Sequence, residues 1–494
     1  MRTSIIPDFT CSRVRENVAN AVPSSHRPLS DESGYTFRMR SRVRENVAAM
    51  ILPGFWRGLL LALLLGSTAH AQPGVREIHA PLTITNPGSY KLVRNISHGV
   101  TPVVVAANDV TIDLNGFRLG SAGFFPPYGP AILQQPGFRN LTIRNGSLFS
   151  ADSHGLQAPG RGTVVESVNV SGCPRTAILA GDDARIVGAV IMSNAVSVSA
   201  AIVQAGAGSQ LEQLVMIGNT ITTGAVVSVG PSSILRDVAL HNNQITGASG
   251  QGIRAGAGTI LERITVQGHQ APAGSFTGIQ SLGGDGLTLA SVAVFSNTAQ
   301  QIAYGIDLAG GANVRGVLSG RNTSTSANPG IGILTRGPAR LTAVLATRNT
   351  GNEGVGWRAE AGGRGVAVIG AANSHFGFHA ISGAALDACL AATNGWRGFN
   401  LAANNRVENS LAADNGEEGG FRTTGNGNVI AENHAVRNAR GFVINGSQNL
   451  AHGNSASANT SANYVVGGGN NVGAISIKPG YLFNSTNPWT NFDL

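Results

Sequence analysis

The acidic residues offer the first candidates for chemistry, because hydrolysis of a glycosidic bond needs two opposed carboxyl groups. Asp182 and Asp183 stand side by side, and Asp152 lies one predicted repeat earlier. If the three came together, they could supply the acid and the base for hydrolysis. The alternative is a solvated turn in which the adjacent pair interacts with Arg185.

A lyase reaction would need a different set of groups. Elimination at a uronate uses a Ca²⁺ site of several carboxylates and an arginine or lysine as base. Asp285 and Asp307 are too few for a dedicated calcium cage, although Asp307 remains a catalytic candidate. The chain has two lysines, Lys91 and Lys478, one near each end of the repeats, which excludes a central lysine base. We therefore predict no cofactor, and the sequence gives a Ca²⁺ site no support.

Arginines supply candidates for binding an anionic ligand. Arg321 and Arg348 each directly precede an asparagine that closes a predicted strand. Equivalent positions on adjacent repeats would place both guanidinium groups at one corner, where a uronate carboxylate or a sulfate fits between them. Arg336 is a third candidate for the same ligand. The alternative is pairing with Glu353 or plain solvation.

Aromatic and histidine side chains complete the predicted binding set. Phe276 and Tyr304 could stack on sugar rings, and His269 stands in the same region. The composition there, rich in Gln, Ser, Thr and Asn, suits a neutral or anionic glycan as well as ordinary solvated turns. The histidines His375, His379, His434 and His452 occupy different offsets within their repeats, so we predict that they do not converge on a metal ion.

A ladder of dipeptides shows which elements must position these residues. A small residue followed by an aliphatic or aromatic one recurs at steps of 21 to 28 residues. Such a period indicates a solenoid whose coils bury their apolar faces by stacking. The pairs are Val103-Val104, Ala131-Ile132, Gly155-Leu156, Ala177-Ile178, Ala201-Ile202, Ala225-Val226, Gly252-Ile253, Gly278-Ile279, Gly305-Ile306, Gly330-Ile331, Gly354-Val355, Gly377-Phe378, Gly398-Phe399, Gly420-Phe421, Gly441-Phe442 and Asn463-Tyr464.

The coils are predicted to consist of strands. Short β-prone runs such as Val110 to Leu114 and Leu261 to Val266 alternate with period two between Gly and Asn residues. A second ladder places asparagine at the end of a strand in successive coils, where stacked amides can bond to one another, and His269 interrupts it. This ladder comprises Asn194, Asn219, Asn243, Asn297, Asn322, Asn349, Asn373, Asn394, Asn415, Asn438 and Asn459.

The coil period, the asparagine ladder and the run Asn108 to Gly116 (NDVTIDLNG) resemble the right-handed parallel β-helix superfamily of pectate-lyase-like proteins. The resemblance covers roughly residues 75 to 490. It implies an all-β, right-handed parallel β-helix of about 15–16 coils. It does not specify an activity, because that superfamily includes lyases, hydrolases, epimerases, binding proteins and proteins without known activity.

The N-terminal residues are predicted to be a targeting region. Residues 50–71 read as a signal peptide, with Arg57, a leucine-rich core and a small-x-small site ending at Ala71, which predicts a secreted or periplasmic protein. The alternative is a retained N-terminal anchor. Residues 1–49 contain the octapeptide SRVRENVA twice, and we predict that they are a disordered, non-native upstream extension.

Charge and cysteine content exclude some functions. The formal charge falls from +8 for the whole chain to +4 without residues 1–71, so nucleic acid is not an expected partner. After cleavage, no membrane-spanning anchor is expected. Cys173 and Cys389 lie nine predicted coils apart, roughly 43 Å at about 4.8 Å per coil, so no intramolecular disulfide is expected.

These observations predict an N-terminal cap at 72–102, a β-helix at 103–466 and a C-terminal cap at 467–494. Function is expected on the longer coils between Ala225 and Gly354, whose extra residues should form turns that a ligand can contact. The first hypothesis is an exported protein that binds, and could cleave, a polysaccharide or envelope glycan. The competing hypothesis is a non-catalytic structural or adhesive protein of the cell surface.

Overall fold

The computed structural model describes residues 74–122, 129–197, 200–284, 286–477, 487 and 489–494. The chain is divided into two units, and all described residues belong to the second, His70–Leu494. The predicted extension (1–49), the predicted signal peptide (50–71) and Asp285 lie outside the described residues. No helix within the described ranges is long and apolar enough to cross a membrane.

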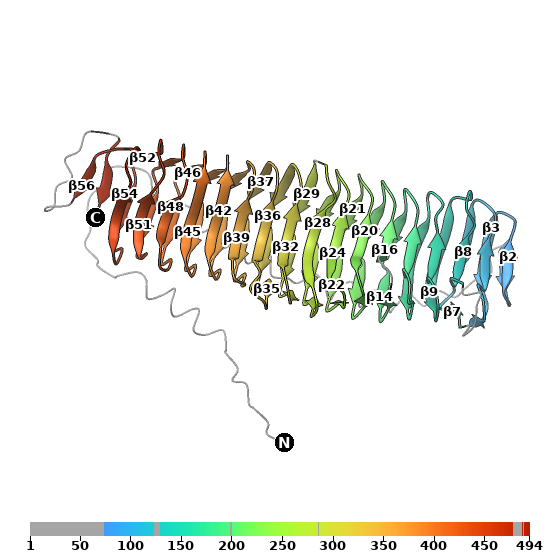
Figure 1. The fold of residues 1–494 in the computed structure, drawn as a ribbon. Helices are drawn as coiled ribbons and strands as arrows, with labels where there is room; N and C mark the ends of the chain where they lie inside the picture. Colours follow the sequence, from blue (N-terminus) through green and yellow to red (C-terminus); the bar gives the residue numbers. More distant parts are fainter. Residues whose placement is uncertain (1–73, 123–128, 198–199, 285, 478–486, 488) are drawn as a thin grey trace, which may run out of the picture. The chain divides into compact units, whose positions relative to one another are not determined.

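The second unit is a parallel β-helix, as the sequence predicts (Figure 1). One face, sheet B, is a parallel sheet of 17 strands, in which each strand pairs with the equivalent strand of the next coil. Its strands are β2 (Leu82–Ile84), β5 (Val103–Val105), β8 (Ile132–Gln134), β10 (Leu156–Ala158), β12 (Ile178–Ala180), β16 (Ala200–Ala205), β20 (Gly224–Val229), β24 (Ser249–Ala255), β28 (Ser275–Ser281), β32 (Ala303–Leu308), β36 (Gly330–Thr335), β39 (Gly354–Ala359), β42 (Phe376–Ser382), β45 (Arg397–Ala403), β48 (Gly419–Thr423), β51 (Arg440–Ile444) and β54 (Ala462–Val466).

Two further faces make up sheet A. The long strands β9 (Leu141–Ser150) and β11 (Val164–Ser171) contribute to both. The first face contains, besides these, β1 (Arg76–Ile78), β3 (Gly88–Leu92), β6 (Val110–Asp113), β13 (Arg185–Val187), β17 (Gln210–Glu212), β21 (Ile234–Arg236), β25 (Ile260–Glu262), β29 (Leu287–Ala290), β33 (Ala312–Arg315), β37 (Ala339–Thr342), β40 (Arg364–Val366), β43 (Ala385–Asp387), β46 (Arg406–Glu408), β49 (Val429–Ala431), β52 (Leu450–His452) and β55 (Asn471–Val472).

The second face of sheet A follows one corner later in each coil. It contains β4 (Ile96–His98), β7 (Arg118–Ser121), β14 (Val190–Met192), β18 (Val215–Ile217), β22 (Ala239–His241), β26 (Thr265–Gln267), β30 (Ala293–Phe295), β34 (Leu318–Gly320), β38 (Leu345–Thr347), β41 (Ile369–Ala371), β44 (Leu390–Ala392), β47 (Leu411–Ala413), β50 (His434–Val436), β53 (Ser455–Ser457), β57 (Asn491–Asp493) and its neighbour β56 (Ile475–Ile477). Because β1 to β4 already pair with the next coil, the solenoid begins before residue 103.

The extra residues of the long coils do not form the expected protruding turns. Most of them extend the coil into a narrow fourth face, sheet C, whose strands are two residues long. These are β15 (Ala195–Val196), β19 (Thr220–Ile221), β23 (Gln244–Ile245), β27 (Gln270–Ala271), β31 (Thr298–Ala299) and β35 (Thr323–Ser324), followed by the single bridge Thr323–Thr350. Pairing satisfies backbone groups that a loop would leave to water.

The dipeptide ladder forms the core on sheet B, with a register that differs from the prediction in some coils. Val203, Val227, Ile253, Ile279, Ile306, Ile333, Trp357, Phe378, Phe399, Phe421, Phe442 and Tyr464 align across successive strands. The predicted Ile331 and Val355 lie two residues before the true positions, Ile333 and Trp357. Both segments repeat the glycine-aliphatic pattern (GIGI and GVGW), so the sequence offers two equivalent registers and packing selects the second.

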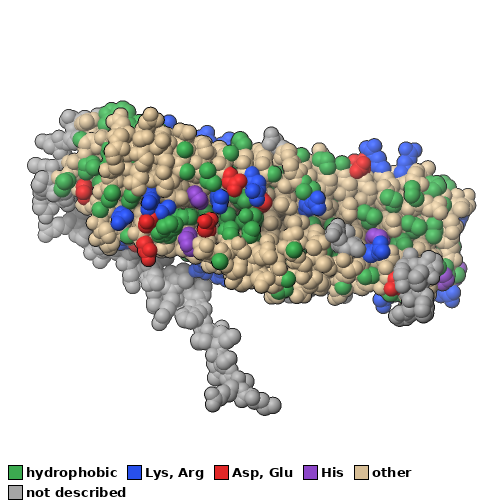
Figure 2. Space-filling view, viewed as in Figure 1, with side chains coloured by type: hydrophobic (Ala, Val, Ile, Leu, Met, Phe, Trp, Pro, Cys, Tyr) green, Lys and Arg blue, Asp and Glu red, His purple; other side chains and the backbone are tan. Residues whose placement is uncertain are grey.

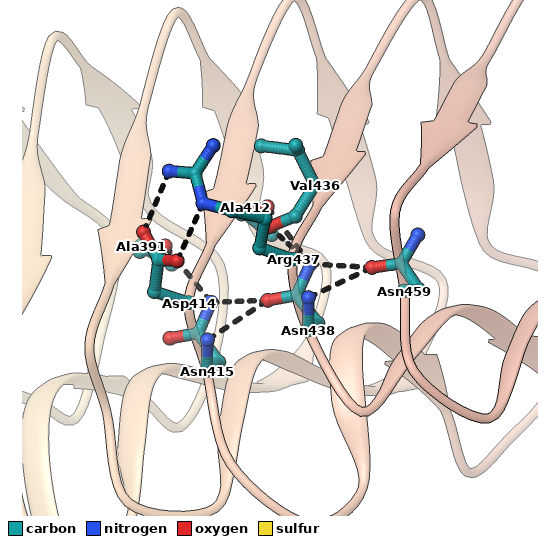
Figure 3. A network of polar contacts seen from close by, with 8 residues as sticks. All are labelled: Ala391, Ala412, Asp414, Asn415, Val436, Arg437, Asn438 and Asn459. Atoms are coloured by element: carbon teal, nitrogen blue, oxygen red, sulfur yellow. Dashed lines mark hydrogen bonds and ion pairs between the residues drawn. The ribbon is translucent and has the colours of Figure 1, made fainter. Parts of the chain in front are cut away.

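The asparagine ladder is confirmed as a hydrogen-bonded column. Along most of the column each amide donates to the side-chain oxygen of the asparagine in the next coil, for example from Asn415 to Asn438 at 2.9 Å and from Asn438 to Asn459 at 3.1 Å (Figure 3). His269 interrupts the column. Its backbone NH donates to Asn297, but the side-chain amide of Asn243 donates to the carbonyl of Met216 and not to an asparagine of the next coil. Cys173 and Cys389 are buried free thiols.

Candidate functional site

The outer face of sheet B carries a cluster of charged, polar and aromatic side chains over β32 to β48. In Figure 2, acidic, basic, histidine and hydrophobic side chains mix in this region. Asp307 directly follows the inward-facing Ile306, so it points to the outer face. Tyr304, at the start of β32, is half-buried in a hydrophobic cluster separate from the main core. We call this region the sheet B patch. It comprises Tyr304, Asp307, Arg336, Glu353, Arg358, Glu360, His375, Phe376, His379, Trp396, Arg397, Asn400, Glu418 and Arg422.

A row of apolar side chains lies along one side of the sheet B patch and shares Tyr304 and Phe376 with it. Tyr304, Ile331, Val355 and Phe376 align across four successive strands. With Leu334 and Trp396 they form a hydrophobic cluster separate from the main core. Phe376 and Trp396 contact each other with ring centroids 5.2 Å apart. The prediction placed Ile331 and Val355 in the main core, and this two-residue error in register concealed the separate cluster. Within that cluster Ile331, Val355 and Phe376 are buried, and Tyr304 and Trp396 are half-buried.

A polar row runs parallel to the apolar row, three residues further along each strand. Arg358, His379, Asn400 and Arg422 align on β39, β42, β45 and β48. Three of these four carry a buried polar atom without a hydrogen-bond partner among the described residues: Nε of Arg358, Nδ1 of His379 and Nε of Arg422. Buried polar atoms without partners are uncommon. Because Nε of Arg358 faces Glu360 at 3.6 Å, Nδ1 of His379 and Nε of Arg422 are the two atoms of this row left without a neighbouring partner within the described ranges.

Ion pairs hold the arginines at the β32 end of the patch. Arg336 donates to both carboxylate oxygens of Asp307, at 2.9 and 3.0 Å, and Asp307 is almost buried. Arg358 lies 3.6 Å from both Glu353 and Glu360. Burial raises the pKa of the Tyr304 hydroxyl beside them. The paired arginines fix the geometry of this end, because a bidentate contact restrains the guanidinium plane.

At the other end of the patch, Arg397 connects the apolar row to the polar row. Its guanidinium carbon lies 3.8 Å from the centroid of the Trp396 ring, and it donates to Asn400 at 2.7 Å and to Glu418 at 2.9 Å. Glu418 also accepts from Arg422. Burial lowers the pKa of Arg397 to about 10, so this side chain remains charged at neutral pH.

His379 lies between these two groups of arginines. Burial, together with the positive charges of Arg358 and Arg397, lowers its pKa to about 4. The imidazole is therefore neutral at neutral pH and can accept one hydrogen bond and donate another. Its ring contacts Phe376, with centroids 5.2 Å apart, so it joins the apolar row to the polar row.

The structure brings together three of the predicted site residues, Tyr304, Asp307 and Arg336, in the sheet B patch. Phe276 and His269 are buried and stack on each other at 5.1 Å, so neither ring reaches the surface to contact a sugar. Burial lowers the pKa of His269 to about 4. These two rings belong to the interior, where the missing asparagine leaves room for an aromatic pair.

The predicted carboxylate cluster does not assemble. Asp152 follows β9 at the corner before sheet B, whereas Asp182 and Asp183 follow β12 at the corner after it. Asp182 accepts from the backbone of Ala207 at 2.8 Å, and Asp183 pairs with Arg161. The expected partner Arg185 is instead bound to Glu166 at 2.6 Å.

Arg321 and Arg348 are exposed at the asparagine corner, on adjacent coils as predicted. Glu353 is paired with Arg358 and not with Arg348. Within the described residues, no group of three or more His, Cys, Asp or Glu side chains could hold a metal ion.

Sequence reasoning missed the whole polar row and Trp396, since it named His379 only as a histidine that does not converge on a metal ion. A usable signal was present, since Arg358, His379, Asn400 and Arg422 each directly follow the core aromatic residue of their coil. In a strand, neighbours of an inward residue point outward. Aligning the coils on those aromatic residues would have placed these four side chains in one row.

Comparisons with known proteins give little information about this chain. No family model and no curated protein matches it. Among solved structures, it is similar to the Azotobacter vinelandii mannuronan C-5 epimerase AlgE6 A-module, with 12% sequence identity and a TM-score of 0.35, over 75% of this chain and 91% of that one. Similarity at this level carries no information about substrate or reaction. The class defined by the strands themselves is the parallel β-helix.

Proposed function

We propose that this protein binds a polysaccharide along the outer face of sheet B, between β32 and β48. The observation that supports this most directly is the polar row, in which the side chains of Arg358, His379 and Arg422 are partly exposed. Of these, His379 and Arg422 also each hold a buried polar atom without a hydrogen-bond partner in the part of the chain that the structure describes. Sugar hydroxyls can donate to the imidazole and accept from the guanidinium groups. Trp396 and Tyr304, both half-buried, add apolar surface suited to the faces of sugar rings.

The rows also suggest how the polymer lies. Both cross the strands, so they run along the axis of the solenoid, with about 4.8 Å between successive side chains. A linear polymer laid along this axis would meet one polar side chain per coil. We therefore propose several sugar subsites in line, without the single deep pocket of a small-molecule site.

The charges in the sheet B patch favour binding as its role. Asp307, Glu360 and Glu418 each lie in an ion pair with at least one arginine. Both oxygens of Asp307 already accept hydrogen bonds from Arg336, so this carboxylate has no free oxygen to act on a substrate. Cleavage of the polysaccharide is therefore not part of this proposal. The binding experiment described below also measures released reducing ends and unsaturated products, so it would detect cleavage.

Export of the protein is part of the same proposal, because it determines where the protein meets its ligand. We propose that residues 50–71 direct export and that cleavage after Ala71 leaves a secreted or periplasmic protein, which meets its glycan outside the cytoplasm. Sequencing the N-terminus of protein recovered from the periplasm or medium tests this, and a start at Gln72 is expected. A start at Met1 or Met50 would contradict it.

Glycan binding is tested with the purified protein against neutral and anionic polysaccharides, following binding by calorimetry and release of reducing ends and unsaturated products. We expect saturable binding that Trp396→Ala and Arg422→Ala each weaken by roughly tenfold, the loss from one good contact. Arg437→Ala is the matched control, because Arg437 is exposed and paired with Asp414 away from sheet B. Binding that persists in both patch variants would refute the proposed site. No binding to any glycan would favour a structural or adhesive role.

A further inference from the structure

The corner residues that precede the asparagine column share one backbone conformation. Arg321, Arg348, Asp414 and Arg437 have φ angles of 53°, 56°, 56° and 53°. Each also donates its backbone NH to the next coil in the same register: Arg321 to the carbonyl of Thr347, and Asp414 to that of Val436. Equivalent backbones project equivalent Cβ atoms, so one such pair shows what another can reach.

The pair Asp414 and Arg437 shows that side chains at this corner meet between adjacent coils. Arg437 donates through Nε and Nη2 to the two carboxylate oxygens of Asp414, at 2.8 and 2.9 Å (Figure 3). A different corner repeats the arrangement, where Arg263 donates to Asp237 at 2.7 and 2.9 Å. A corner arginine thus places its guanidinium over the corner residue of the preceding coil.

At Arg321 and Arg348 the same geometry holds two cations. Arg348 occupies the position of Arg437, and Arg321 occupies the position of Asp414. Neither has an acidic partner within 4.0 Å among the described residues, and both are exposed. Two guanidinium groups in this arrangement repel each other, and an anion between them removes the repulsion. The corner therefore has the donors of the Asp414–Arg437 contact without its carboxylate.

We propose that Arg321 and Arg348 form an oxyanion site, in which a carboxylate or sulfate group takes the place that the Asp414 carboxylate takes beside Arg437. The planar guanidinium of Arg348 offers two parallel N–H donors to such a group, and Arg321 adds a third from the preceding coil. The group could belong to a polymer or be a free anion. The site does not depend on the sheet B patch, since it uses none of its residues.

The test titrates the full-length protein with sodium sulfate against sodium chloride at equal ionic strength, following binding by calorimetry. Arg321→Asp is the decisive variant, because it rebuilds the ion pair seen at Asp414 and Arg437. We expect this variant to fold, to melt no lower than the wild type, and to lose sulfate binding by at least about tenfold. Arg437→Ala should bind sulfate like the wild type. Unchanged sulfate binding in Arg321→Asp, or none in the wild type, would overturn the proposal.

A second titration with dextran sulfate and with a polyuronate identifies the source of the anion. If a polymer binds more tightly than sulfate and Arg321→Asp abolishes that binding, the natural ligand is an anionic group on a polymer. If polymer and sulfate bind equally, the ligand is a free anion. The oxyanion site stands in both cases. Trp396→Ala separates this site from the proposed glycan site, because it should leave sulfate binding unchanged even where glycan binding fails.

Discussion

The central and the C-terminal coils are held together by different side chains. The C-terminal coils add two columns of hydrogen-bonded asparagines to the first one. The second, at a second corner, runs through Asn405, Asn428, Asn449 and Asn470, and the third, at a third corner, through Asn433, Asn454 and Asn491. In the central coils, the second corner carries hydroxyl residues such as Ser209 and Ser233, and the third carries buried aliphatic residues such as Leu214 and Val238. The central coils instead gain sheet C.

The sheet B patch lies where one type of coil gives way to the other. Tyr304 and Asp307 belong to the last coils of sheet C, whereas His379, Arg397 and Arg422 belong to the coils without it. The step between coils falls from 25 residues after Gly305 to 21 after Gly377. A change in coil cross-section creates a surface that a uniform repeat lacks, and the candidate site occupies that surface.

The interior differs as well, and it gives the largest predicted effect. Phe399 stacks on Phe378 and on Phe421, with centroids 4.6 Å apart on each side, whereas aliphatic residues fill the same column in the central coils. We expect Phe399→Ala to lower the free energy of unfolding by about 3–5 kcal/mol, since it leaves a cavity in the column. Urea denaturation followed by circular dichroism measures this loss.

The control for this variant is Phe295→Ala, which removes a half-buried ring from the outer face of sheet A. Its cost should be clearly smaller, because the solvent can fill the space that the ring leaves. Equal losses in the two variants would show that the aromatic column does not stabilise the C-terminal coils more than a surface ring does.

The asparagine column offers a finer comparison between the two regions. Asn415 accepts hydrogen bonds from both the backbone and the side-chain amide of Asn394, at 3.1 and 2.9 Å. Asn297 accepts one, from the backbone of His269 at 3.0 Å. Replacing Asn415 by alanine therefore leaves two buried donors unpaired, and we expect a loss of at least about 2 kcal/mol.

Asn297→Ala is the matched variant in the central coils, since it leaves one such donor unpaired. We expect it to cost about 1 kcal/mol less than Asn415→Ala, measured by the same denaturation. If the Asn297 variant were the less stable of the two, the column would not be weaker at its interruption, and the distinction drawn here between the regions would fail.

The fold was predictable because its two ladders recur through most of the coils. The Gly377-Phe378 and Gly398-Phe399 pairs recur without ambiguity. A Cβ at either glycine would clash with the next coil, at 2.8 Å from the carbonyl oxygen of Gly398 and at 2.6 Å from that of Gly420. The asparagines are equally regular. Sheet C was not predictable from these ladders, because strands of two residues carry no periodic pattern of their own.

The candidate site was predicted only in part, for a physical reason. Tyr304, Asp307 and Arg336 were named as single residues, whereas the patch depends on which strands lie in register. At GIGI and GVGW the sequence permits two registers, and only packing of Trp357 inside the solenoid selects one. Without that choice, the row from Arg358 to Arg422 cannot be recognised.

Protonation of His269 should destabilise the central coils as the pH falls. Its pKa is about 4 in the folded state, because of burial, against about 6.5 in an unfolded chain. The stabilisation from the neutral ring is complete above pH 6.5 and is lost as the pH falls toward 4. Between pH 8 and pH 5 we expect the wild type to lose about 2 kcal/mol more than His269→Asn. Denaturation at both pH values measures the difference, and parallel losses would exclude His269 as the cause.

The smallest effect is expected at the exposed corner of the C-terminal coils. Arg437 and Asp414 form a bidentate ion pair, but both side chains are at least 40% exposed, so water screens their attraction. Arg437→Ala should therefore change the free energy of unfolding by less than about 1 kcal/mol. A larger loss would mean that corner ion pairs, and not the buried asparagine and aromatic columns, hold these coils together. The unpaired arginines at Arg321 and Arg348 would then be a costly feature, which strengthens the case that an anion occupies their corner.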